Sequence, residues 1–147
     1  YPSRDEEERI VNATTGDITT EIHPVLRAEQ LVELQHLVRR LPAPPTVVKY
    51  AVQLARSTRP DGAEATPQVK RYVGWGAGPR ASQYLVLGAK ARAAIAGRPM
   101  ADLDDVRAVA PAVLPHRLVT NFAAEAADRT SEDLVRELVG GKAWLAG

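Results

Sequence analysis

Residues 74–97, GWGAGPRASQYLVLGAKARAAIAG, decide the fold of this 147-residue chain. Pro79 stands where a first helical residue is favoured, and Gly97 stands where helices commonly end. The residues between them are apolar almost all round the predicted helix, so we expect the other helices to pack against it. Gly88 and the many alanines should let those neighbours approach closely.

Capping signals and apolar periodicity predict more helices before this segment. The capping-box spacing of Ser3 and Glu6 opens a short helix to about Asn12, and residues 13–24 form a connecting loop. A stripe at helical spacing predicts an amphipathic helix, which the following prolines end. The stripe consists of Leu31, Leu34, Val38 and Leu41. Another helix is expected over about 46–58.

The segment from Asp61 to Gly78 breaks this pattern with proline, glycine and charge. One short apolar piece at Tyr72-Val73 suggests a single short strand. After Gly97, Asp102 and Asp105 have the spacing of an acidic capping box and predict a further helix. We expect Pro111 to break or kink that helix, a short helical piece to reach about Leu118, and a last helix to begin at Ser131.

Composition places these helices in one globular domain, and the predicted fold class is an all-α helical bundle. The chain is 45% apolar and 25% charged, and it contains no Cys, which excludes disulfides, thiolate nucleophiles and Cys-based metal sites. We expect no membrane span and a cytoplasmic location, since no apolar run approaches ~20 residues and no signal region opens the chain. Because position 1 is Tyr, we also expect the chain to be a fragment of a longer protein.

Most catalytic templates are absent from the sequence. His23, His36 and His116 lie far apart and have no carboxylate at a metal-ligand spacing, so no metal site is predicted. Gly140-Gly141-Lys142 lacks the Ser or Thr and the first glycine of a P-loop. Thr58-Arg59 suits a helix C-terminus, where a cation is favourable, and His116-Arg117 suits a contact between helices.

The glycine-rich loop before Pro79 is the strongest candidate for chemistry. Glycines let backbone N–H groups converge, and a helix N-terminus carries partial positive charge, so an anion fits there. Arg80 in the first helical turn is unfavourable by ~0.3–1 kcal/mol unless an anion contacts it. The alternative is a tight turn in which Arg80 bonds a neighbouring carboxylate. Local physics favours neither interpretation.

At residues 76–82 the chain resembles the sensor 2 motif of MoxR-type AAA+ ATPases, which usually reads G-A-S-P-R-A. Gly78 departs from the motif, where the family has Ser. Other family elements follow in the same order, and together they cover roughly residues 1–118. They are Tyr1-Pro2 with Glu7-Glu8, Tyr50 with Thr58-Arg59, Ala94-Ile95-Ala96-Gly97-Arg98, Asp105-Val106 and Val113-Leu114-Pro115-His116-Arg117-Leu118. Magnesium-chelatase ATPase subunits, a sister family, carry related elements.

The resemblance implies an AAA+ lid over residues 1–122, including a core-to-lid connector over 1–24. Residues 123–147 would be a C-terminal extension with a short helix packed on the lid. Arg80 would be the catalytic sensor 2 arginine, and residues 61–78 a candidate hinge. The nucleotide-binding residues would be Gly76, Ala77, Gly78, Pro79 and Arg80.

Walker A and B motifs are absent, so we expect this chain alone not to hydrolyse ATP. ATP and Mg would be bound by the full-length parent. The implied partners are the missing core, neighbouring subunits of a hexameric ring, a von Willebrand factor A domain protein and a metal-dependent client. Two other classes compete with this interpretation. One is a helical protein-interaction module without a nucleotide, using the apolar and arginine-bearing faces of the early helices. The other is nucleic-acid binding through Arg39, Arg40 and Arg71, which the net charge of +1 disfavours.

Overall fold

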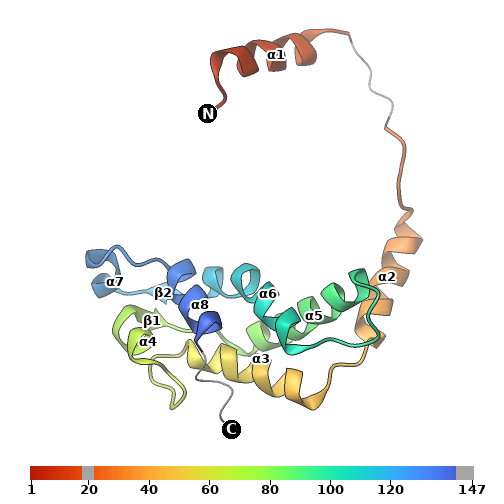
Figure 1. The fold of residues 1–147 in the computed structure, drawn as a ribbon. Coiled ribbons are helices and arrows are strands. Elements are labelled where there is room, and N and C mark those ends of the chain that lie inside the picture. The colour runs from red at the N-terminus through yellow and green to blue at the C-terminus, as the bar shows by residue number, and fades with distance from the viewer. Residues whose placement is uncertain (18–21, 142–147) are drawn as a thin grey trace. The chain divides into compact units, whose positions relative to one another are not determined.

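The computed structural model describes residues 1–17 and 22–141, and it divides the chain into two units at Val32/Glu33. Figure 1 labels the elements along the chain. Part of the predicted connector, residues 18–21, and the end of the predicted extension, residues 142–147 with Lys142, lie outside the described residues.

The first unit contains α1 (Arg4–Thr15) and the beginning of α2 (Ala28–Arg40). Glu6 accepts a hydrogen bond from the Ser3 backbone N–H at 2.8 Å, as the capping-box spacing predicts. The helix runs past Asn12, so the prediction of a loop from residue 13 is wrong for its first residues. Thr14 and Thr15 hydroxyls donate to carbonyls four residues earlier, at 2.8 and 2.7 Å, within this extra turn.

Three helices build the core of the second unit, α3 (Pro45–Ser57), α5 (Pro79–Ile95) and α6 (Leu103–Val113). Helix α5 packs against both others, as expected for a central helix. It buries one stripe of small and apolar side chains, however, and Ile95 at its end is 88% exposed. The stripe is Ala81, Leu85, Ala89 and Ala93. A Cβ atom at Gly88 would lie 3.3 Å from Val109 of α6, which confirms the close approach predicted there.

The sequence predicted the C-terminal end of α5 correctly, but not that of α6. Gly97 has φ +67°, the left-handed conformation that favours glycine after a helix. Pro111 lies inside α6, which continues to Val113, so the prediction of a break is wrong. A proline so near the C-terminal end removes one backbone hydrogen bond, and the next turn still closes, because the Leu114 N–H donates to the Ala110 carbonyl at 2.9 Å.

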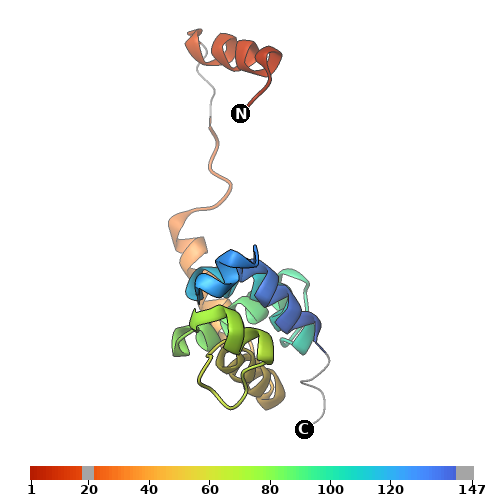
Figure 2. The same ribbon diagram turned by 90° about the vertical axis from the view of Figure 1, so that its left-hand side faces the viewer.

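The segment before α5 holds a helix that the sequence analysis missed, α4 (Pro67–Tyr72), followed by β1 (Val73–Trp75). Tyr72 is therefore helical, and the predicted strand begins one residue later. Strand β1 pairs antiparallel with β2 (Val119–Thr120) in a two-stranded sheet. Figure 2 shows the same ribbon turned by 90° about the vertical axis.

After α6 come η1 (Pro115–Arg117), β2, α7 (Phe122–Ala126) and α8 (Ser131–Gly140). The short piece ending near Leu118 and the last helix are thus confirmed, whereas α7 was not predicted. Helix α8 packs on α6, η1 and α3. The fold class is all-α with one small sheet, as predicted. No helix among the described residues is long and apolar enough to cross a membrane.

Candidate functional site

The start of α5 is open. Gly78, the N-cap, is extended with φ −79° and ψ 179°, and no side chain caps the helix. A Cβ atom built at Gly78 would meet nothing within 4 Å. Arg80 in the first turn is exposed, and no described residue forms a hydrogen bond or ion pair with its guanidinium. The alternative interpretation required a bond between Arg80 and a neighbouring carboxylate. No such bond is present among residues 1–17 and 22–141.

The loop residue Ala77 is buried and fixed, in contrast to Arg80. Its N–H donates to Oγ1 of Thr58 at 2.9 Å, and its carbonyl accepts from Nε of Arg59 at 2.9 Å. Gly76 lies so close to the end of α3 that a Cβ atom there would be 2.4 Å from the Thr58 carbonyl oxygen. Gly76 and Ala77 therefore support the loop, and Ala77 keeps no free backbone donor for a phosphate.

Thr58 and Arg59 are the functional candidates whose role the sequence did not reveal. Their predicted place at a helix C-terminus is confirmed, but nothing in the local sequence indicates that they reach a loop 18 or 19 residues away. The TR pair within the family resemblance was the one available hint. The contact depends on how α3 and the loop meet in space.

A cavity of about 350 Å³ adjoins this loop on the side of α3. Trp75 in its wall is 74% exposed. Arg56 and Glu64, which also line it, pair at 2.7 Å, and this hydrogen bond lowers the pKa of the Glu64 carboxyl. The walls comprise Arg56, Arg59, Pro60, Asp61, Gly62, Glu64, Gly74, Trp75, Gly76, Ala77 and Gly78. Arg80 is not among them. The ion pair and the contacts of Ala77 tie residues 61–78 to α3, which disfavours a free hinge there.

The Gly97-Arg98 and Asp105-Val106 elements come together in the structure. Asp105 is 2% exposed, and the Arg98 guanidinium donates to its two carboxylate oxygens at 2.8 and 2.5 Å. This hydrogen bonding lowers the pKa of Asp105 to about 2. Asp105 also completes a reciprocal capping box with Asp102. These motif residues thus close the start of α6, and the described residues contain no group of acidic or His side chains suited to a metal ion.

Arg117 joins η1 to its neighbours, as predicted for a contact between helices. Its guanidinium donates to the Val113 carbonyl at 2.7 Å and lies 5.1 Å from the centre of the Tyr84 ring of α5. His116 is exposed beside it. These contacts give Arg117 a structural role.

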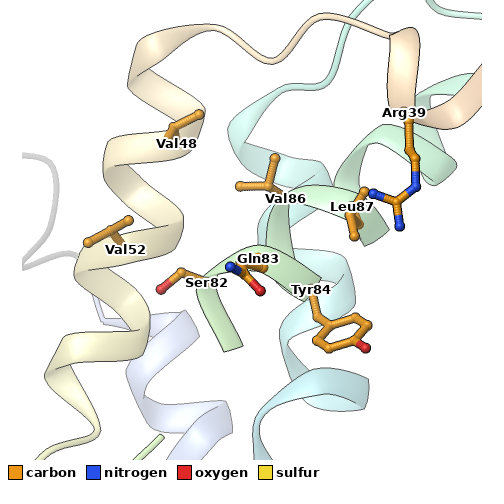
Figure 3. Close-up of a pocket in the computed structure, with 8 residues that line it drawn as sticks. All are labelled: Arg39, Val48, Val52, Ser82, Gln83, Tyr84, Val86 and Leu87. Atoms are coloured by element: carbon orange, nitrogen blue, oxygen red, sulfur yellow. The ribbon is translucent and has the colours of Figure 1, made fainter. Parts of the chain in front are cut away.

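A second, larger cavity of about 580 Å³ opens between α2, α3 and α5 (Figure 3). Helix α3 contributes Val48 and Val52, and both are about two-fifths exposed, at 41% and 39%. The other lining residues are Arg39, Ser82, Gln83, Tyr84, Val86 and Leu87. This groove is mostly apolar and has the character of a contact surface more than of a catalytic site.

Comparison with known protein families decides the assignment. The family model of the AAA lid domain matches residues 67–138, which include α4, the glycine-rich loop before α5, and α5 and α6. Over these residues the chain matches the AAA lid family. Its lid elements lie within the all-α unit described above, and the open start of α5 is part of the matched region.

Two curated relatives extend this match over most of the lid chain. The chaperone MoxR1 of Mycobacterium tuberculosis is 33% identical over 135 residues, which cover 92% of this chain and 35% of that protein. The uncharacterized protein YeaC of Bacillus subtilis is 29% identical over 140 residues, covering 95% of this chain and 41% of YeaC. The chain thus spans about two-fifths or less of the length of these relatives, and it is similar to MoxR-like proteins through its AAA lid region.

A solved structure agrees with the fold. The crystal structure of a "putative ATPase" from Cytophaga hutchinsonii superposes with a TM-score of 0.79 at 21% identity. The match covers 95% of the lid chain and 42% of the solved chain.

Proposed function

We propose that this lid contacts the γ-phosphate of ATP through Arg80 and transmits hydrolysis-driven motion in a MoxR-type AAA+ ATPase. The observation that carries the proposal is the exposed Arg80 without a partner among the described residues, in the first turn of a helix that no side chain caps. Both features are mildly unfavourable in isolation. An anion at this place would remove both costs.

Arg80 acts in this proposal as an electrostatic stabiliser. An arginine that contacts a transferring phosphoryl group offsets the charge that develops on its oxygens, and such a contact can contribute several kcal/mol to the barrier. The same contact distinguishes ATP from ADP, because only ATP presents a γ-phosphate. The lid would then respond to hydrolysis, either in its own subunit or across a ring interface.

The remaining parts of the machine would come from outside this chain. A nucleotide-binding core would hold ATP and Mg, and neighbouring subunits of a hexameric ring would complete the site. A cytoplasmic, chaperone-like role with a von Willebrand factor A domain protein and a metal-dependent client follows from the family resemblance. MoxR1 is itself described as a chaperone.

The test is steady-state ATP hydrolysis by the full-length parent at saturating ATP. Arg80→Ala should lower turnover tenfold or more, since each tenfold corresponds to about 1.4 kcal/mol of barrier. Arg136→Ala is the matched control, because it removes an arginine from the exposed face of α8, where the side chain is 77% exposed. Equal turnover in wild type and Arg80→Ala, with the ring intact, would contradict the proposal.

A second candidate function is a helical interaction module without a nucleotide. The specific observation in its favour is the apolar surface of α2, where Leu34 and Leu37 are 45% and 44% exposed, close in sequence to the groove residue Arg39. Leu34→Ser with Leu37→Ser should abolish partner capture in this case and leave turnover unchanged. Loss of turnover without loss of any partner would count against it.

A further inference from the structure

We infer that Thr58 and Arg59 are positioning residues that hold Arg80 in place by gripping both backbone groups of Ala77. The inference rests on the proposed role of Arg80 and names the residues that set its position. Thr58 and Arg59 are consecutive residues at the end of α3, and Ala77 precedes the α5 N-cap by one residue. The two contacts join the end of one core helix to the start of the next.

The contact with Thr58 is the critical one, because Ala77 is only 1% exposed. Its N–H donates to Thr58 Oγ1, which in turn donates to the Ala55 carbonyl at 2.7 Å. The Thr58 hydroxyl thus donates a hydrogen bond to α3 and accepts one from the loop. Without this acceptor a buried N–H would lack a partner, which is a costly state that the loop would relieve by moving toward water.

The contact with Arg59 restrains the other side of Ala77. Its Nε donates to the Ala77 carbonyl, so the residue is held through its donor and its acceptor at once. Gly76 fits against α3 only because it has no Cβ atom. Gly78 is then the one residue between this fixed point and Pro79. A shift of Ala77 would pass directly into the first turn of α5, where Arg80 lies.

A fixed backbone position at Arg80 has a functional consequence. A phosphate contact contributes to catalysis only when its geometry is held before the reaction, and small displacements are costly. With α3 and α5 joined at Ala77, a pull on Arg80 would also move α3 rather than bend the loop. Thr58 would thus influence turnover without touching the nucleotide.

The structure offers a matched pair of variants for the test. Ser57 and Thr58 are both fully buried, and both hydroxyls donate to an α3 carbonyl at 2.7 Å. Only Thr58 also accepts from Ala77. Thr58→Val removes that acceptor at constant shape, Thr58→Ser keeps it, and Ser57→Ala removes the neighbouring hydroxyl as the control.

The first measurement is amide hydrogen exchange at Ala77 in the full-length parent. Thr58→Val should speed exchange at Ala77 at least tenfold relative to core amides of α3, whereas Thr58→Ser and Ser57→Ala should leave that ratio within twofold. Unchanged exchange at Ala77 in Thr58→Val would overturn the inference.

The second measurement is turnover in a double-mutant cycle with Arg80→Ala, which separates positioning from general destabilisation. Thr58→Val should lower turnover threefold to tenfold when Arg80 is present and have no further effect in Arg80→Ala. Thr58→Ser should restore most of the loss. Equal losses in both backgrounds would mean a structural role and overturn the inference.

The cycle also distinguishes the two claims. Turnover that falls in Arg80→Ala but not in Thr58→Val would remove the positioning role and leave the proposed function standing. Turnover that is unchanged in Arg80→Ala would remove the proposed function, and the positioning role would fall with it.

Discussion

The starts of α5 and α6 combine the same parts, an arginine beside a helix N-terminus, with opposite results. At α6, Asp102 accepts from the Asp105 N–H at 2.9 Å, Asp105 accepts from the Asp102 N–H at 3.0 Å, and Arg98 pairs with Asp105. At α5, Gly78 supplies no side-chain acceptor, and no described residue pairs with Arg80. Among the described residues, the chain provides an anion at the start of α6 and none at the start of α5.

This difference distinguishes the motif residues at the start of α6, which have a structural role, from the candidate site at the start of α5. The family elements around Arg98 and Asp105 are explained by the contacts within the lid, so they need no ligand. The open start of α5 is not explained in this way, and its supporting loop is nevertheless held firmly by Thr58 and Arg59. A firmly held but unsatisfied helix start is what an external phosphate would require.

The largest expected effect on stability comes from removing the contacts of Asp105 that cap the start of α6. Asp105→Ala removes a buried carboxylate, half of a capping box and the partner of Arg98, so we expect a loss of about 3 kcal/mol in the free energy of unfolding. Urea denaturation of the purified chain measures this. Asp104→Ala is the control, because the neighbouring Asp104 side chain is 85% exposed and should cost under about 0.5 kcal/mol. Similar losses in both variants would contradict the assigned role of Asp105.

Low pH should weaken the same Asp105 contacts at the start of α6 in the wild-type protein, because it protonates the carboxylate. The folded pKa of Asp105, about 2, lies below its ordinary value of 3.8. A lowered pKa means that the ion pair stabilises the fold fully above pH 5, and that this stability is lost as the pH falls through 4 toward 2. The contribution is about 2 kcal/mol.

The control for acid is Asp105→Asn, which has no carboxyl to titrate at this position. The stability difference between wild type and Asp105→Asn should therefore shrink between pH 5 and pH 2, as followed by thermal unfolding. A constant difference over that range would mean that Asp105 does not titrate as its contacts imply. Other carboxyls with lowered pKa, such as Glu6 and Glu64, remain in both proteins and cancel.

Gly76→Ala tests the support of the open start. Its new Cβ atom would meet backbone atoms at 2.4 and 2.6 Å, which cannot swing aside as a side chain would. We expect a loss of about 1.5 kcal/mol in unfolding free energy. Thermal unfolding and exchange at Ala77 would report this loss. Unchanged values of both would mean that the loop does not pack against α3 as described.

Gly78→Ser should have the smallest effect on stability. It gives the start of α5 a side-chain cap like the one at the start of α6. Space around Gly78 is open, and its φ of −79° suits any residue. A serine N-cap should stabilise α5 by a few tenths of a kcal/mol, and it would restore the residue that the family motif usually has. Thermal unfolding against wild type measures the gain. A clear destabilisation would show that the N-cap is crowded.

The sequence predicted the elements that have strong local signals. Pro79 and Gly97 bracket α5 closely, and the Asp102 and Asp105 spacing marks the start of α6. Helix α4 was missed although Thr66 and Pro67 provide a cap and a first residue, because a helix of six residues shows less than two turns of periodicity. The break predicted at Pro111 was wrong for a related reason, since the effect of a proline depends on how much helix remains after it.

The candidate site divides in the same way. Local physics singled out Arg80 and its glycine-rich loop as a candidate, because an unfavourable cation at a helix start is visible in the sequence. The grip of Thr58 and Arg59 on Ala77 was not, because it depends on the meeting of α3 and the loop in space. The burial of Asp105 likewise became clear only from the packing of Arg98 upon it.

The most direct test of the central claim is the affinity of the full-length parent for ADP and for a slowly hydrolysed ATP analogue, with and without Arg80→Ala. The account predicts that the variant loses about tenfold in affinity for the analogue, about 1.4 kcal/mol, and keeps its affinity for ADP. Equal affinities in wild type and variant, or an equal loss for both nucleotides, would contradict a contact between Arg80 and the γ-phosphate.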